Sequence, residues 1–305
     1  MDTNSLTQFE IDWICRSIHP HAKLCTVEPL VGATTSDLFL CAVELPGPTF
    51  ERVVLRRYTG RELSPSELEM AEQESWALRV AESAALPAPR LIASDLSSSG
   101  GRRPMILMSC VPGRVVLLPK NMDNWLREMA GALYAIHQVP AGNAPYHYLP
   151  WYAEVPPELP SWSRLRTEWT TAISIALGPL PDNPQHFIHR DFHPCNVLFD
   201  GDRLSGVVDW VNGCRGMAGV DIAHCRWNLA LLHGMDAADR FVDLYKDFAG
   251  MHWKYEPYFD LVELSEKSWT PDVYPGWPAH GVLGLNGKMM LERTEALLLS
   301  ALSRL

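Results

Sequence analysis

The sequence lacks the closely spaced cysteines that would indicate a disulfide framework or a structural zinc site. Its seven cysteines form no CxxC pair. They stand at positions 15, 25, 41, 110, 195, 214 and 225. An odd number of isolated cysteines is typical of reduced thiols in a cytosolic protein. We therefore expect a cytoplasmic protein without structural zinc.

Basic clusters and long apolar runs are missing as well. The formal net charge is −10 and the basic residues are dispersed, so the counterion release that drives non-specific nucleic-acid binding has little to act on. No apolar run approaches the length that spans a bilayer. The first residues also lack the basic and then apolar segments of a secretory signal. We expect neither nucleic acid nor membrane as a partner.

The chain does contain enough apolar residues for a large folded protein. It has 305 residues, of which 47% are hydrophobic. Chains beyond about 250–300 residues usually split into more than one globular unit. Proline and glycine at Pro112 and Gly113 interrupt the pattern after an apolar run, which favours a boundary there. We predict a first lobe over 1–108, a hinge over 109–113 and a second lobe over 114–305.

The two predicted lobes differ in secondary structure, which makes the fold class α+β. In the first lobe, β-branched and apolar runs predict strands, and two capping boxes, one of them at Ser5-Leu6-Thr7-Gln8, predict helices. These strands are at 26–31, 37–44, 51–58 and 105–108, and the helices end near 18 and span 65–84. The second lobe is predicted to be mostly helical, because apolar residues recur at helical spacing. Its helical patterns lie around 122–136, 221–232, 236–249 and 286–304.

Glu74 is the unusual residue of the predicted helix over 65–84. It falls within the apolar face of that helix, where an unpaired carboxylate would be costly. Two interpretations are open on helix geometry alone. Either Glu74 has a cationic partner, or it lies at the edge of the face and reaches water.

The stretch from Phe187 to Trp210 carries the chemistry. Two short apolar strands flank an Asp-Gly turn, so we predict a loop that runs into a hairpin. Asn196 then precedes the first strand and Asp209 follows the second, and antiparallel pairing brings the two together. Asp191 lies in the preceding loop. Amide and carboxylate oxygens suit Mg²⁺, which also takes phosphate oxygens.

This pattern resembles a known family. His189-Arg190-Asp191, with Asn196 five residues after the aspartate and Asp209 in Val-Asp-Trp, is similar to the core of the aminoglycoside phosphotransferase and choline kinase family. The resemblance implies a two-lobed protein-kinase-like fold and transfer of the γ-phosphate of ATP or GTP to a small-molecule hydroxyl. It also implies that Asp191 acts as the catalytic base and that Asn196 and Asp209 hold Mg²⁺.

The same resemblance assigns nucleotide-binding positions in the first lobe. Arg56 occupies the place of the usual phosphate-binding lysine, because no lysine occurs between Lys23 and Lys120, and Glu74 is its expected charge partner. An exposed strand end is the alternative for Arg56. Four further residues complete the predicted site. They are Gly32 and Ser36 in the phosphate-covering loop and the backbone near Ser109 and Val111 at the purine.

Three residues near the catalytic aspartate need separate interpretation. His189 and His193 stand four apart, but Pro194 excludes a helix there and no His-Glu-x-x-His pattern is present, so a zinc hydrolase is disfavoured. We expect His189 to bond the loop backbone. Asp221 matches a family aspartate that orders the catalytic loop, and an N-cap of the following helix explains it equally well.

The acceptor is left open by the sequence. An aminoglycoside, macrolide, choline, sugar or other metabolite would each fit, and an antibiotic acceptor would make the protein a resistance determinant. Acidic residues of the second lobe could receive an amine, although solvated helix faces explain most of them better. They are Asp236, Asp239, Asp243, Asp247, Glu256, Asp260, Glu263 and Glu266. Two rival functions are nucleotidyl transfer on the same scaffold and a catalytically weak or inactive nucleotide-binding kinase homologue. We expect a monomer or a homodimer.

Overall fold

The computed structural model describes residues 6–30, 36–47, 49–59, 67–97, 102–150, 153, 155–266 and 270–305. The chain forms two compact units. The first unit contains Met1–Ser83, Pro87–Val111 and Trp210–Asn212, and the second contains Ala84–Leu86, Pro112–Asp209 and Gly213–Leu305. The short segment Trp210–Asn212 therefore packs with residues that are far from it in sequence.

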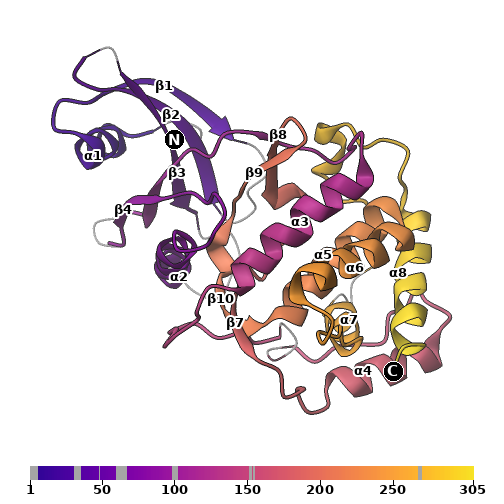
Figure 1. Ribbon diagram of the computed structural model, residues 1–305. Helices are drawn as coiled ribbons and strands as arrows, with labels where there is room; N and C mark the ends of the chain where they lie inside the picture. The colour runs from indigo at the N-terminus through magenta and orange to yellow at the C-terminus, as the bar shows by residue number, and fades with distance from the viewer. Residues whose placement is uncertain are drawn as a thin grey trace. The chain divides into compact units, whose positions relative to one another are not determined.

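The first unit is built on a five-stranded antiparallel sheet with the strand order β1-β2-β3-β5-β4 (Figure 1). The strands are β1 (Lys23–Leu30), β2 (Ser36–Glu44), β3 (Phe50–Tyr58), β4 (Leu91–Asp95) and β5 (Met105–Ser109). Alternate residues of β2 are buried from Phe39 onward, as expected for a strand with one face on a core, whereas β3 buries residues on both of its faces. Phe39, Val53, Leu55 and Leu107 form this core together with Ile14 of helix α1 (Gln8–Ile18).

Helix α1 begins at a different residue from the one the sequence suggested. The predicted capping box started at Ser5, but the N-cap is Thr7, whose hydroxyl accepts from the amide of Glu10 at 3.3 Å. The Glu10 carboxylate in turn accepts from the amide of Thr7 at 2.6 Å. Glu10 also forms an ion pair with Arg57 of β3 at 3.1 Å. The reciprocal hydrogen bonds between Thr7 and Glu10 form the capping box, so the N-cap is Thr7 and not the predicted Ser5.

The second helix of the first unit is α2 (Glu67–Ala81). Its buried residues include Ala71, Glu74, Ala77 and Leu78, so the predicted apolar face and its embedded carboxylate are both present. The predicted N-terminal cap of this helix lies outside the described residues. The 3₁₀ turn η4 (Trp210–Asn212) packs against α2.

The second unit is mostly helical. Helix α5 (Ala218–His233) is buried on nearly all sides and packs against three others, α6 (Met235–Ala249), α7 (Tyr258–Ser265) and α8 (Gly287–Leu302). The unit also contains α3 (Met122–His137) and α4 (Arg166–Ala176). Its short strands form two small sheets. They are β6 (Arg114–Val115), β7 (Gln185–Ile188), β8 (Val197–Asp200), β9 (Arg203–Val207) and β10 (Cys214–Met217).

Helix α5 approaches α7 very closely at Gly219. A methyl group on Gly219 would overlap the ring of Phe259, so only glycine fits at this crossing. This close approach brings the polar residues of α5 near those of α7. Across the described residues, no helix is both long and apolar enough to cross a membrane.

Candidate active site

The predicted loop and hairpin are present in the second unit. Strands β8 and β9 pair antiparallel with Val197 opposite Val207, and the turn between them contains Gly201 in a left-handed conformation. The carbonyl oxygen of Asn196 accepts from the amide of Val208 at 2.9 Å. Asn196 and the residue after Val208, Asp209, therefore lie at the same end of the hairpin. This local prediction is confirmed.

Asp221 holds the backbone of the loop that carries Asp191. Its carboxylate, which is fully buried, accepts from the amides of His189 at 2.8 Å and Arg190 at 2.5 Å. The side chain of His137 contacts the same carboxylate at 3.1 Å. Asp221 lies inside α5, whose N-cap is Met217. The prediction that Asp221 orders the loop is confirmed, and the N-cap alternative is wrong.

His189 has the structural role predicted for it. Its Nε2 bonds the carbonyl oxygen of Val208 at 3.0 Å, and its Nδ1 accepts from the amide of Asp191 at 3.3 Å. The imidazole therefore ties the loop to the end of strand β9. With both nitrogens used, His189 has no lone pair for a metal.

Two residues of this region have a strained backbone. Arg190 has a φ of 66° and Asp209 a φ of 69°, and they are the non-glycine residues with positive φ in the described part of the chain. Such conformations cost about 1–3 kcal/mol each and persist where surrounding contacts enforce them, most often at functional sites. One strained residue precedes Asp191, and the other is a predicted metal ligand.

The side-chain oxygens of Asn196 and Asp209, at the end of the hairpin, are suitable ligands for a hard cation. The amide nitrogen of Asn196 donates to the carbonyl oxygen of Asp191 at 2.9 Å and to its Oδ2 at 3.2 Å. With the nitrogen used in this way, the amide oxygen of Asn196 is the atom left for a metal. Together with the carboxylate of Asp209, it offers the oxygen ligands that Mg²⁺ prefers.

Asp191 has a partner that the sequence did not reveal. Its Oδ1 lies 3.1 Å from Nε2 of His224 on α5, and Nδ1 of His224 lies 3.0 Å from Oε1 of Glu263 on α7. The side chain of Asp191 is 31% exposed, so an acceptor hydroxyl can reach it. His224 is thus held between two carboxylates, one of which faces solvent.

This arrangement determines the charges of the site. Burial by itself lowers the pKa of His224, but the carboxylates of Glu263 and Asp191 outweigh it and raise the pKa to about 10. Burial by itself raises the pKa of Asp191, but the hydrogen bond from His224 and the neighbouring imidazoles hold it well below its usual range. Asp191 is therefore an anion and His224 a cation at neutral pH.

His224 and Glu263 left only weak signals in the sequence. His224 stands three residues after Asp221, which places both on one side of a helix. Glu263 belonged to the acidic set for which solvated helix faces were the favoured explanation. That interpretation is wrong for Glu263 and for Asp260, which are 6% and 0% exposed. Asp260 forms a buried ion pair with Arg226, which also contacts Asp239 at 2.6 Å.

Arg56 and Glu74 meet in the first unit. Nε of Arg56 lies 3.4 Å from Oε2 of Glu74, and the hydroxyl of Tyr58 donates to the same oxygen. Arg56 is 4% exposed and Glu74 is fully buried, so the exposed strand end and the water-facing glutamate are both wrong. Arg57 points to the opposite face of β3, where it pairs with Glu10 and Asp37. Arg56 is thus the arginine that Glu74 positions.

The other predicted nucleotide contacts are described in part. Gly32 lies outside the described residues. Ser36 begins β2, is buried, and its hydroxyl has no hydrogen-bond partner among the residues that the structure describes. The amide of Ser109 donates to the carbonyl oxygen of Arg90 at 2.9 Å, and its hydroxyl accepts from the amide of Arg90 at 2.8 Å. A purine at Ser109 and Val111 would therefore use other main-chain groups.

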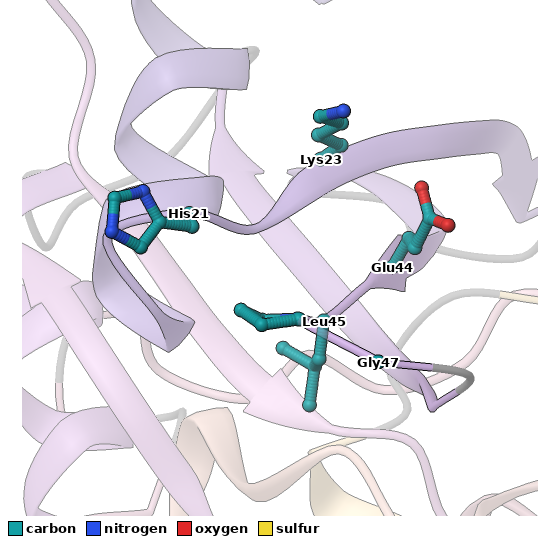
Figure 2. Close-up of a pocket in the computed structure, with 6 residues that line it drawn as sticks. His21, Lys23, Glu44, Leu45 and Gly47 are labelled. Carbon is teal, nitrogen blue, oxygen red and sulfur yellow. The ribbon is translucent and has the colours of Figure 1, made fainter.

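A surface pocket of the first unit lies apart from these residues. It is formed where β1 begins and β2 ends, and none of the predicted site residues lines it (Figure 2). Its lining residues are His21, Lys23, Glu44, Leu45, Pro46 and Gly47.

Comparison with known proteins places the chain in a family. Residues 41–257 match the model of the phosphotransferase enzyme family, which is well over half of the sequence. The chain belongs to this family. The matched region contains Arg56, Glu74 and the whole hairpin with its loop. The resemblance drawn from Asp191, Asn196 and Asp209 is confirmed at the level of the family.

Among curated proteins, homoserine kinases are similar to part of the chain. The enzyme of Rhizobium meliloti is 31% identical over 152 residues, which are 46% of this chain and 45% of that protein. The homoserine kinase of Sinorhizobium medicae is 32% identical over 152 residues, with the same coverage. The similarity thus spans less than half the length of these relatives.

Solved structures confirm the protein-kinase-like α+β fold. A putative aminoglycoside phosphotransferase from Ralstonia eutropha has a TM-score of 0.62 at 15% identity, over 96% of both chains. A thermostable mutant of the aminoglycoside phosphotransferase APH(4)-Ia, in a ternary complex with AMP-PNP and hygromycin B, has a TM-score of 0.61 at 16% identity. That match covers 91% of this chain and 95% of the other.

Proposed function

We propose that this protein is a small-molecule kinase that moves the γ-phosphate of ATP or GTP to a hydroxyl group. One observation carries the proposal. In a member of the phosphotransferase enzyme family, a solvent-accessible aspartate, Asp191, is hydrogen-bonded to Asn196 at the hairpin end that also carries Asp209, and Asp221 fixes the backbone of its loop. Family membership supports phosphoryl transfer, and the loop geometry supports the assignment of the residues.

Asp191 aligns the acceptor in this proposal. Its carboxylate is anionic at neutral pH because its pKa is held well below the usual range. Such a group accepts a hydrogen bond from the acceptor hydroxyl and orients its oxygen. As that oxygen bonds to the γ-phosphorus, the bond from phosphorus to the β–γ bridging oxygen breaks and the nucleoside diphosphate leaves, while the hydroxyl proton passes to the Asp191 carboxylate and from there to solvent. Phosphoryl transfer is catalysed mainly by positioning and electrostatics, so a weakly basic carboxylate is sufficient.

Asn196 and Asp209 would hold Mg²⁺ by their side-chain oxygens. The cation supplies neutralisation of phosphate charge when it is bound. Arg56 is proposed to bind phosphate oxygens, with Glu74 fixing its guanidinium. The buried hydroxyl of Ser36 and the backbone at Gly32 would contact phosphate, and the backbone near Ser109 and Val111 would contact the purine. Such main-chain contacts favour neither ATP nor GTP.

The test compares three aspartates of one short segment. We expect Asp191→Asn and Asp209→Asn to lower kcat by about 10²–10⁴-fold, because each removes a charge that acts on the transferred group or its acceptor. Asp200→Asn is the matched control, since Asp200 is exposed at the opposite end of β8. The measurement is Mg²⁺-dependent ATP and GTP turnover with a panel of acceptors. Full activity of Asp191→Asn would refute the assignment.

The panel combines the substrates named for the relatives with the acceptors that the sequence left open. It contains homoserine, hygromycin B and other aminoglycosides, a macrolide, choline and simple sugars. The mass of the product distinguishes phosphoryl transfer from nucleotidyl transfer, because the two reactions add different groups. All seven cysteines are free thiols, which supports the proposal of a cytoplasmic enzyme. Size measurements in solution decide between a monomer and a homodimer.

A further inference from the structure

We propose that Asp191, His193 and His224 form a zinc-binding site, and that Zn²⁺ bound there occupies the carboxylate used for phosphoryl transfer. The site itself is argued from the geometry of three side chains. Its consequence for activity rests on the proposed function. The two parts are tested by separate measurements.

The three side chains converge on a volume suited to one metal ion. Oδ1 of Asp191 lies 3.1 Å from Nε2 of His224 and 3.9 Å from Nε2 of His193. One ligand atom from each residue lies within 4.8 Å of the others. Zn²⁺ binds nitrogen and oxygen at about 2.0–2.2 Å, so tetrahedral ligand atoms stand about 3.3–3.6 Å apart. Small side-chain movements are enough to reach this spacing.

Glu263 orients His224 by a hydrogen bond to the ring nitrogen that faces away from the proposed metal. Its Oε1 lies 3.0 Å from Nδ1 of His224, on the opposite side of the ring from Asp191. Metal-binding histidines are commonly held by a carboxylate in this way, which keeps Nδ1 protonated and directs the lone pair of Nε2 to the metal. Zn²⁺ would take the place of the hydrogen that His224 now shares with Asp191, and that proton is released to solvent.

His193 is held in place without a competing hydrogen bond. Its ring packs edge-on against those of His224 and Tyr274, with centroid distances of 5.7 and 6.5 Å. Its Nδ1 is buried and has no hydrogen-bond partner in the described part of the chain. No contact therefore fixes its tautomer, and Nε2 can offer a lone pair to a metal.

The chemistry of the ligands separates this site from the magnesium site. Two imidazoles and one carboxylate suit Zn²⁺, whereas the amide and carboxylate oxygens of Asn196 and Asp209 suit Mg²⁺. The two sites are neighbours, because Asn196 of the magnesium site donates a hydrogen bond to the second oxygen of Asp191, Oδ2, at 3.2 Å. Zn²⁺ on Oδ1 leaves that contact in place and withdraws Asp191 from the acceptor. Three protein ligands leave one coordination position for water.

The binding test uses the full chain without nucleotide. Metal-free protein is titrated with Co²⁺, whose visible spectrum reports tetrahedral coordination, and bound Co²⁺ is then displaced by Zn²⁺. We expect His193→Asn and His224→Asn to abolish the tetrahedral spectrum, and Glu263→Gln to weaken binding by about 10–100-fold. His252→Asn is the matched control, because His252 is exposed. Circular dichroism verifies that each variant is folded.

Two results would overturn the zinc site. One is the absence of a tetrahedral Co²⁺ spectrum in the wild-type protein. The other is unchanged binding in folded His193→Asn, which keeps the His224–Asp191 contact and so isolates one ligand. Metal binding through cysteine thiolates would give this second result, because it would survive in both histidine variants.

The activity test separates the two proposals. At saturating Mg²⁺, we expect Zn²⁺ to inhibit turnover of the wild type and of His252→Asn, and the inhibitory concentration to rise at least about 10-fold in His193→Asn. Zinc binding without any turnover would refute the proposed function alone. Turnover that is insensitive to zinc would refute the inhibitory role.

Discussion

Two buried carboxylates, one in each unit, differ in whether they bind main-chain amides. Glu74 of the first unit contacts side chains, the guanidinium of Arg56 and the hydroxyl of Tyr58. Asp221 of the second unit accepts from two main-chain amides, those of His189 and Arg190. Both are fully buried.

The difference shows what each carboxylate can position. A carboxylate bonded to a side-chain cation places one charge, and its effect depends on that cation. A carboxylate bonded to the backbone places a whole loop, so the side chains of that loop stay available for chemistry. Asp221 thus supports Asp191 without touching its side chain.

The largest expected effect is that of Asp221→Ala. Two buried donors and one partly buried donor lose their acceptor, at about 1–3 kcal/mol each, so we expect a destabilisation on the order of 5 kcal/mol. Turnover should fall as well, because Asp191 loses its support. Asp243→Ala is the control, since Asp243 is exposed on α6. Urea unfolding and turnover provide the measurements, and a change as small as that of the control would contradict the role of Asp221.

A smaller loss is expected for Glu74→Gln. The substitution keeps an oxygen for Tyr58 but leaves the charge of Arg56 without its buried counter-ion, which costs about 3 kcal/mol. The KM for ATP should rise more than kcat falls, because Arg56 is proposed to bind phosphate. Glu72→Gln on the exposed face of α2 is the control, expected within about 0.5 kcal/mol of the wild type. An unchanged KM for ATP would show that the Arg56–Glu74 pair takes no part in nucleotide binding.

The smallest effect is a pH dependence of the network around Asp221. His186 bonds the carbonyl oxygen of His137 at 2.7 Å, and burial lowers the pKa of His186 below 6.5 despite that bond. As the pH falls through 6.5, the unfolded chain binds a proton more readily than the folded protein, so stability is lost on acidification. His186→Gln keeps a donor but cannot titrate. We expect the Tm of this variant to fall less than that of the wild type between pH 7.5 and 5.5. Equal losses of Tm in the two proteins would show that titration of His186 does not cause the pH dependence.

Local features of the site could be predicted because neighbouring residues dictate them. The Asp-Gly turn and the apolar runs on both sides of it specify the hairpin, and the hairpin places Asn196 beside Asp209. For Glu74, helix geometry left a partner and exposure to water both open. The family resemblance named Arg56 as the partner, and the structure pairs the two side chains.

Other features could not be predicted from local pattern. Helix α7 has eight residues and is buried almost throughout, so it shows no amphipathic period. Helix α4 and strand β4 were missed as well, since each lies beside a stretch rich in proline. In each case tertiary packing selects the conformation.

The sequence by itself determined the α+β fold class, the family and the order of Asp191, Asn196 and Asp209, because strand, turn and helix signals act over a few residues. Only the tertiary structure decided what surrounds Asp191. His224 and Glu263 come from α5 and α7, which approach closely because Gly219 admits the ring of Phe259. Contacts between residues this distant depend on the packing of whole helices, which no local pattern encodes.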